Sequence, residues 1–94
     1  MTELAEKIRQ ELAKIKDPLT NVPVIFLDAE IDIKVQPEGI VYIVYFAKDP
    51  YSSNVITYVE AVKKIASKIA GDRKILVEVR NHMLSDLLNM RLNE

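Results

Sequence analysis

The sequence contains no cysteine, and this absence removes several kinds of chemistry at once. Its 94 residues also include no tryptophan, one histidine and two glycines. Disulfides, thiolate nucleophiles and cysteine-ligated metals are excluded, and Gly39 and Gly71 stand too far apart to form a phosphate-binding loop. The lone His82 supplies neither a catalytic pair nor a metal-ligand set, so we expect a surface or packing role for it. We therefore expect no metal and no cofactor.

The sequence also lacks an excess of charge of either sign. Thirteen basic residues against fourteen acidic ones leave a net charge of −1, which gives no electrostatic reason to expect binding to nucleic acid or to a membrane surface. No apolar run approaches the roughly 18–20 residues of a membrane span. The N-terminal residues 1–4 lack the basic and apolar regions of a signal peptide, so a cytoplasmic protein is expected.

What the chain does contain is enough apolar material for one folded domain over residues 1–94. Hydrophobic residues make up 49% of it and charged residues 29%, as in an ordinary globular protein. Its most apolar stretch, Ile40–Phe46, has seven consecutive apolar or aromatic residues, and four of them are β-branched. This run predicts a strand buried on both faces. Asp49-Pro50 ends it, because proline cannot donate to the ladder.

Three segments have the periodicity of helices. The first is predicted over about residues 3–16, ending before Asp17-Pro18, and the second over residues 55–70, where Ser53 or Asn54 can cap the start. A third, short helix is predicted from about residue 84 to 91. The inward positions of the first two are Leu4, Ile8, Leu12 and Ile15, then Val55, Val59, Val62, Ala66 and Ile69.

Alternation predicts two more strands, over residues 29–36 and 74–80. The connection at residues 37–39 favours an antiparallel hairpin between the first strand and Ile40–Phe46. The helix over 55–70 then makes the last two strands parallel. Residues 24–27 are either a buried extended segment or a short helical turn. The fold class is a two-layer α+β fold of order α-β-β-α-β-α, with a three-stranded mixed sheet and two main helices on one face.

Two helices can cover only one face of such a sheet. Both sets of alternating side chains in Ile40–Phe46 are large and apolar, so something should cover the other face. The candidates are residues 24–27, the C-terminal segment, or another protein molecule. A homodimer is thus one of the expected arrangements.

The loop between Ile40–Phe46 and the second helix is the first candidate for a functional site, because loops held by rigid elements commonly carry function. Ser52 and Ser53 lie at a helix N-terminus, where either capping or an anion site is expected. A nucleophilic serine would need flanking glycines and a base that the sequence does not identify, so capping is favoured. The closely spaced Asp28, Glu30 and Asp32 are interpreted as a solvated face rather than a cation site.

Three segments resemble the opening of the PaaD/SufT-type iron–sulfur cluster assembly domains. They are Lys16-Asp17-Pro18, Val24-Ile25-x-Leu27 and Ile31-Asp32-Ile33-Lys34-Val35. The strand, loop, helix and strand that follow have the order and spacing of that family. The resemblance covers nearly the whole chain and implies the same fold, together with a role in iron–sulfur assembly.

The chain departs from this family in the loop itself, where the family usually has T-x-T-x-P-x-C-P. Pro50 is kept, whereas Ser52 stands at the cysteine position and Ser53 at the following proline. Phe46 and Lys48 fall at the threonine positions. Because serine oxygen replaces a thiolate poorly as a soft ligand, the resemblance implies action through protein contact and not through a cluster bound by this chain.

Three functional hypotheses follow. The first is a non-enzymatic interaction domain with a protein partner of the iron–sulfur assembly type. The second is a small hydrolase or transferase that uses Ser52 with a carboxylate such as Asp17 or Asp49, and the third is a divergent domain that retains only the fold. No catalytic residue is assigned, and the candidate binding residues are Asp17, Lys48, Asp49, Pro50, Ser52 and Ser53.

Overall fold

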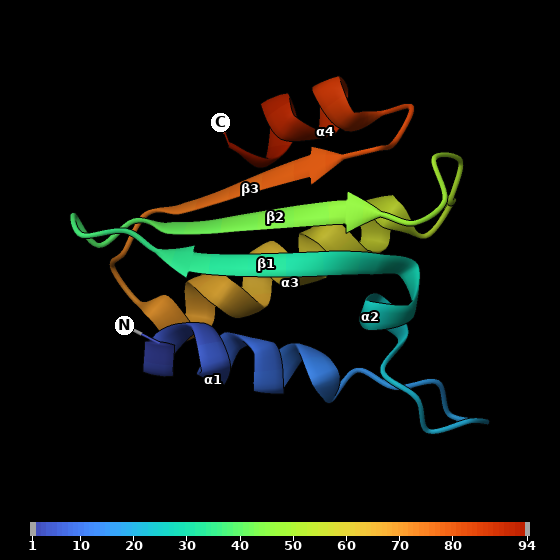
Figure 1. The fold of residues 1–94 in the computed structure, drawn as a ribbon, viewed down its shortest axis with the longest axis horizontal. Helices are drawn as coiled ribbons and strands as arrows, with labels where there is room; N and C mark the ends of the chain where they lie inside the picture. The colour runs from blue at the N-terminus through green and yellow to red at the C-terminus, as the bar shows by residue number, and fades with distance from the viewer. Residues whose placement is uncertain (1, 94) are drawn as a thin grey trace.

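A three-stranded sheet forms one layer of the molecule and two helices form the other (Figure 1). The computed structural model describes residues 2–93, and none of its helices is long and apolar enough to cross a membrane. The elements are α1 (Thr2–Ala13), α2 (Val24–Asp28), β1 (Ala29–Val35), β2 (Val41–Ala47), α3 (Val55–Ala70), β3 (Ile75–Arg80) and α4 (Ser85–Leu92). The predicted mixed sheet with two main helices on one face is confirmed. Residues 24–27, for which an extended segment and a helical turn were both considered, belong to the short helix α2.

The sheet has the order β1-β2-β3, with β2 in the centre. β1 pairs antiparallel with β2, and β2 pairs parallel with β3. The hairpin is closed by Gly39, whose φ of 93° lies in a region that L side chains avoid. The chain crosses from β2 to the parallel strand β3 through α3, the usual strand–helix–strand connection between parallel strands.

The core lies between the sheet and the layer formed by α1 and α3. Alternate residues of each strand point into it, so that Ile33, Ile43 and Val77 form one buried cross-strand row. The helices contribute their apolar stripes, which include Ile8 and Leu12 from α1 and Val59 and Val62 from α3. The inward positions predicted from periodicity are largely those observed.

The end of one helix and the cap of another differ from the prediction. α1 ends at Ala13, earlier than residue 16, because Lys16 pairs with Pro23 in an isolated antiparallel bridge and must be extended. At the start of α3, Asn54 occupies the N-cap without a side-chain capping bond, and no bond from Ser53 replaces it. The expected cap from these two residues is therefore wrong.

The outer edge of β3 is covered by side chains of α4 and of Asn93, the residue that follows it. The Asn89 amide donates to Val79 O (3.1 Å) and accepts from Val79 N–H (2.6 Å). The Asn93 amide does the same at Val77, at 2.9 and 3.0 Å. Each asparagine thus replaces one peptide group of a neighbouring strand, and an exposed strand edge that could pair with another chain is avoided.

The opposite face of the sheet is open: no helix or strand between residues 2 and 93 crosses it, and Figure 1 looks directly onto it. Of the segments considered as covers, α2 lies beside β1 on the helical side, and α4 lies along the edge of β3. Neither covers the face. Its three cross-strand rows are Lys34–Tyr42–Leu76, Asp32–Val44–Glu78 and Glu30–Phe46–Arg80. We call these nine residues the open face.

Candidate functional site

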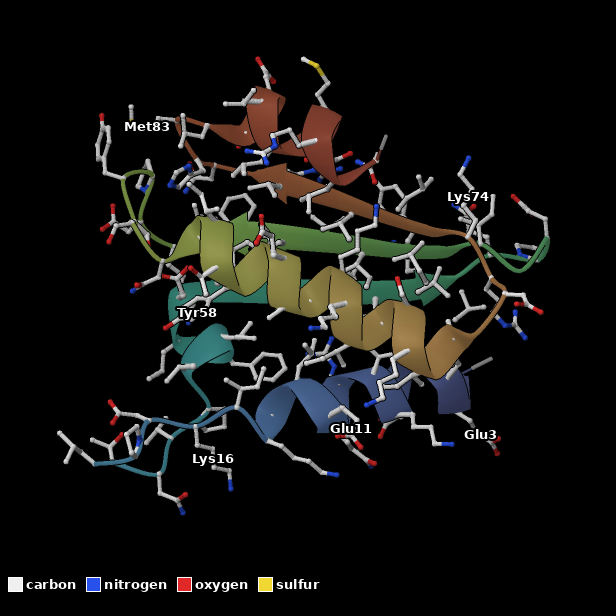
Figure 2. All side chains as sticks on the ribbon, turned by 180° about the vertical axis from the view of Figure 1, so that it is seen from behind. Glu3, Glu11, Lys16, Tyr58, Lys74 and Met83 are labelled. Atoms are coloured by element: carbon white, nitrogen blue, oxygen red, sulfur yellow. The ribbon has the colours of Figure 1, made fainter. Side chains whose placement is uncertain are left out.

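One end of the sheet gathers the start of β1, the ends of β2 and β3, and the N-terminus of α3. Residues 26–28, 48–54 and 81–84 meet there, and we call this region the loop end. In α/β folds, ligands commonly bind outside the carboxyl ends of parallel strands. Figure 2 shows the labelled Met83 and Tyr58 at this end of the molecule and Lys74 at the other. The predicted functional loop is part of the loop end.

Asp28 is the centre of the polar network at the loop end. Its carboxylate accepts a hydrogen bond from Tyr45 Oη at 2.5 Å and another from Ser52 Oγ at 2.7 Å. Tyr45 belongs to β2 and is fully buried, whereas Ser52 belongs to the loop that follows. One carboxylate therefore joins α2, the central strand and the loop.

The phenol of Tyr45 is held in its protonated form. Burial, reinforced by the hydrogen bond to Asp28, raises the pKa of Tyr45 well above its ordinary value. The neutral hydroxyl remains a donor throughout the physiological range. This arrangement supports structure, because a buried hydroxyl needs a partner and the adjacent carboxylate provides one.

His82 connects the loop after β3 to the loop after β2. Its Nδ1 lies 3.1 Å from the Leu84 backbone N–H and accepts from it, which leaves the hydrogen on Nε2. Nε2 then donates to the Ser52 carbonyl oxygen at 2.9 Å. Both ring nitrogens are thus engaged with backbone groups, as the expected packing role requires.

Further bonds hold the two loops in place. Asn81, with a φ of 60°, donates from its amide to Ala47 O at 2.7 Å, and Met83 N–H donates to Pro50 O at 3.0 Å. Lys48 Nζ reaches back to Phe26 O at 3.1 Å. The loop end is fixed by side chains from three separate parts of the chain.

The structure divides the predicted site residues into two groups. Ser52 contacts the network through Asp28 and accepts weakly from Asn54 N–H (3.3 Å), while Pro50 and Lys48 take part through the bonds just described. Asp49 instead closes a local turn by accepting from Tyr51 N–H. Ser53 is exposed and lies outside the network.

Asp17 closes a similar turn by accepting from Leu19 N–H at 2.8 Å. It nevertheless lies near the network, because it lines a shallow pocket of about 260 Å³ beside Asp28. The other residues that line this pocket are Val24, Leu27, Asn54 and Tyr58. Between residues 2 and 93, no three histidine, aspartate or glutamate side chains converge as a metal site would require.

Sequence reasoning did not assign Asp28, Tyr45 or His82 to the candidate site. Asp28 was interpreted as part of a solvated acidic face, but it precedes β1, and alternation along that strand cannot place it. Tyr45 has the pattern of a core residue, which it is. The useful signal was an acidic residue, Asp28, that directly follows the apolar run Val24–Leu27 and directly precedes the strand that begins at Ala29.

Three exposed apolar side chains lie at the loop end. Leu27, Tyr51 and Met83 are 59%, 75% and 68% exposed, respectively. They belong to α2 and to the loops after β2 and β3, whose backbones are held by the network. The loop end therefore combines a fixed polar interior with an apolar exterior.

The open face has a network of its own. Tyr42 Oη donates to Glu78 Oε1 at 2.6 Å, and Arg80 pairs with the other oxygen of the same carboxylate. These two hydrogen bonds lower the pKa of Glu78, and the bond to Glu78 raises the pKa of Tyr42. Tyr42, Glu78 and Arg80 are thus linked by hydrogen bonds across the open face. Phe46, in the same row as Arg80, is 44% exposed.

Comparison of the chain with protein-family models, with curated proteins and with solved structures gave no match.

Proposed function

We propose that the protein is a non-enzymatic interaction domain whose loop end binds a partner protein. The observation that carries this proposal is the apolar exterior of the loop end, formed by Leu27, Tyr51 and Met83 on loops that are held in place from within. Large apolar side chains exposed on a rigid support favour binding, because little conformational entropy is lost when they are covered.

The hydrogen bonds of the loop end also weigh against catalysis. A nucleophilic serine needs a base within reach of its hydroxyl and a third group that orients the base. Ser52 Oγ donates to Asp28, but the imidazole of His82 contacts the Ser52 carbonyl and not its hydroxyl. The polar groups that could act on a substrate are occupied with one another.

The partner proposed is a protein of the iron–sulfur assembly type. This part of the proposal rests on the sequence resemblance, in which Asp17-Pro18, Ile31–Val35 and Pro50 match the pattern of that family. Ser52 stands where the family has cysteine, so this chain would act by contact while another protein holds the cluster. Anaerobic reconstitution of the isolated chain should accordingly leave no stoichiometric iron or sulfide.

Affinity capture tests the proposal with two matched variants. The full chain, Tyr51→Glu and Phe46→Asp are each used as bait in extract of the source cells, and the retained proteins are identified by mass spectrometry. Cluster-assembly proteins should be retained by the wild type and by Phe46→Asp but lost with Tyr51→Glu. Retention that is unaffected by Tyr51→Glu would contradict the loop end as the binding surface, and the absence of assembly proteins would contradict the partner class.

A second candidate function, a small enzyme that uses Ser52 with a carboxylate, is supported by the Ser52–Asp28 contact. The carboxylate in contact is not Asp17 or Asp49. Fluorophosphonate labelling distinguishes the two proposals, because an activated serine reacts and a structural one does not. Labelling that is lost in Ser52→Ala would favour the enzyme.

A further inference from the structure

The two edges of the sheet differ in how the rest of the chain covers them. Along β3, the amides of Asn89 and Asn93 bond to the outward backbone groups of Val79 and Val77. Along β1, the described part of the chain shows a single side-chain bond of this kind, from Arg9. An open strand edge is a template for pairing with another chain. The outer edge of β1 is therefore a second candidate surface, separate from the loop end.

The register of the hairpin determines which backbone groups of β1 face outward. Lys48 N–H donates to Asp28 O at 3.0 Å just before β1, and Gln36 N–H donates to Ile40 O at 2.8 Å just after it. Antiparallel ladders alternate between hydrogen-bonded and non-hydrogen-bonded pairs. Even-numbered residues of β1 therefore bond to β2, and the odd-numbered residues direct their N–H and C=O groups away from the sheet.

Ile31, Ile33 and Val35 thus present donors and acceptors along the outer edge of β1. The Ile31 carbonyl accepts from Arg9 Nη2 at 2.7 Å, and within residues 2–93 no bond reaches the outward groups of Ile33 or Val35. These groups repeat about every 6.6 Å, which is twice the rise of a strand residue. An extended peptide has the same repeat and can bond to several outward residues at once. This is the mode of recognition in which a peptide adds a strand to a sheet.

The position of α1 decides whether the added strand can belong to a second copy of the chain. α1 packs against α3 and β1, and Figure 1 and Figure 2 both show it beyond the outer edge of β1, in the helical layer. A two-fold rotation that joined two β1 edges would carry the α1 of each copy under the sheet of the other, where α3 already lies. An extended segment without such a helix meets no such obstacle.

The charged side chains of β1 set the chemistry of this segment. Glu30, Asp32 and Lys34 are exposed on the open face, and the 3.6 Å contact between Asp32 and Lys34 is a weak surface pair that leaves both available. In an antiparallel addition, the residue opposite Ile33 is preceded by one opposite Lys34 and followed by one opposite Asp32. An acidic residue before it and a basic residue after it would each meet the opposite charge, which stabilises cross-strand pairs.

We propose that the outer edge of β1 binds an extended segment of another protein, which adds as a fourth, antiparallel strand and carries an acidic residue two positions before a basic one. Antiparallel addition lets Ile33 and the residue opposite it exchange both N–H···O bonds, and it is slightly more stable per residue than parallel addition. The backbone bonds supply the affinity, and the charge pairs select the register. A short segment buries little area, so we expect a dissociation constant on the order of 0.1 mM for an isolated peptide.

The chain's own β1 sequence provides a probe with this pattern. In a synthetic peptide of residues 29–36, Asp32 precedes Lys34 by two positions. When its Ile33 lies antiparallel and opposite Ile33 of the protein, Asp32 of each strand lies opposite Lys34 of the other. A shift of two residues is the smallest that keeps the outward groups bonded, and it places either two Asp32 or two Lys34 side chains opposite each other. Charge therefore favours one register.

The experiment is an NMR titration of the isotope-labelled full chain with this peptide, up to about 1 mM. Binding should shift the amide signals of Ile31, Ile33 and Val35 and slow the exchange of their hydrogens with solvent. A second peptide with Asp32→Lys and Lys34→Asp has the same composition and should bind about tenfold more weakly. The protein variant with the same two substitutions should reverse this preference, because the exchanged peptide then meets opposite charges.

A proline on the edge tests the backbone bonds separately from the charges. Val35→Pro removes one outward N–H without removing a bond to β2, and edge strands tolerate proline when its position faces solvent. This variant should bind the peptide about fivefold more weakly. Leu19→Asp is the control, since Leu19 is 93% exposed and lies between α1 and α2, and it should bind as the wild type does. Thermal unfolding checks that the variants fold; if Val35→Pro does not, the charge exchange at exposed positions still tests the proposal.

Four results would overturn the proposal. No binding of the peptide up to about 1 mM would remove the edge as a docking site. Equal affinity for the two peptides would remove the charge pattern, and a preference of the wild type for the exchanged peptide would show parallel addition. Shifts confined to Val77 and Val79 or to the open face would place the peptide elsewhere. None of these results bears on Tyr51 and the loop end, so the two proposals can fail separately.

Discussion

The two ends of the sheet are built on different principles. At the loop end, side chains of Asp28, Ser52, His82 and Asn81 cross between segments that are distant in sequence. At the opposite end, which we call the hairpin end, residues 36–40 and 71–74 are closed mainly by backbone hydrogen bonds such as Gly39 N–H to Gln36 O. A side chain takes part at this end through Arg73, whose Nη1 lies 3.5 Å from Gly39 O.

This difference shows that side-chain hydrogen bonds are used where several loops must be held against one another. A backbone turn needs only the right φ and ψ, so the hairpin end depends on glycine. The loop end instead holds three segments against one another, which turns alone cannot do. Side-chain networks of this kind are stable only while every member has a partner, and that dependence can be tested residue by residue.

The largest expected effect is that of Asp28→Ala. It removes the acceptor of the fully buried Tyr45 hydroxyl and of Ser52, and we expect a loss of about 2–3 kcal/mol in the free energy of unfolding. Urea denaturation measures it. In a double-mutant cycle, Tyr45→Phe should cost less in the Asp28→Ala background than in the wild type, since its hydroxyl has already lost its partner. Equal costs in both backgrounds would show that the network is not coupled.

A somewhat smaller effect is expected at alkaline pH. Because burial and Asp28 raise the pKa of Tyr45, the unfolded chain releases the proton of this tyrosine before the folded chain does. The stabilisation that this protonated hydroxyl contributes to the free energy of unfolding is complete below pH 10. It falls as the pH rises above 10, by up to about 1.4 kcal/mol per pH unit. Urea unfolding at stepped pH should show a shallower decline for Tyr45→Phe. An identical decline in both proteins would contradict the assignment.

At the hairpin end, the substitution expected to matter is Gly39→Ala. The φ of 93° is strained for alanine, and the added Cβ would lie 3.3 Å from Arg73 Nη1. We expect a loss of about 1 kcal/mol, seen as a lower denaturation midpoint with an unchanged denaturant dependence. A neutral Gly39→Ala would mean that the hairpin adapts its backbone freely, and the contrast between the two ends would then be larger than described.

The smallest expected effect is that of Arg73→Ala. The guanidinium is exposed and its contact with Gly39 O is long, so we expect a change below about 0.5 kcal/mol. Differential scanning calorimetry should find almost the same melting temperature as for the wild type. A loss comparable with that of Asp28→Ala would show that the hairpin end also depends on a side-chain network.

The elements themselves could be predicted well from the sequence. The apolar run around β2 determines the centre of the sheet, and the alternation in β1 and β3 determines which face is buried. α3 occupies the predicted residues 55–70, because a long amphipathic stripe ends at Gly71. These features are local, and local periodicity suffices to find them.

The position of α4 and the network at the loop end could not be predicted in the same way. The apolar residues of α4 indicated a helix but not where it packs, since that depends on asparagines that periodicity treats as solvent-facing. The partner of Ser52 is Asp28, 24 residues away, and no spacing rule joins them. Contacts between segments need the three-dimensional arrangement, which the pattern along the chain does not contain.

The spacing of the asparagine pairs along β3 also limits how much of the edge of that strand α4 can cover. Four residues of a helix advance about 6.0 Å, whereas two residues of a strand advance about 6.6 Å. The two repeats agree closely for Asn89 and Asn93 but drift by about 0.6 Å at each further step. Side chains spaced four residues apart on a straight helix can therefore stay aligned with alternate peptide groups of a strand edge for only a few positions. A longer β3 would pass out of phase with α4, and β3, with six residues, is the shortest strand of the sheet.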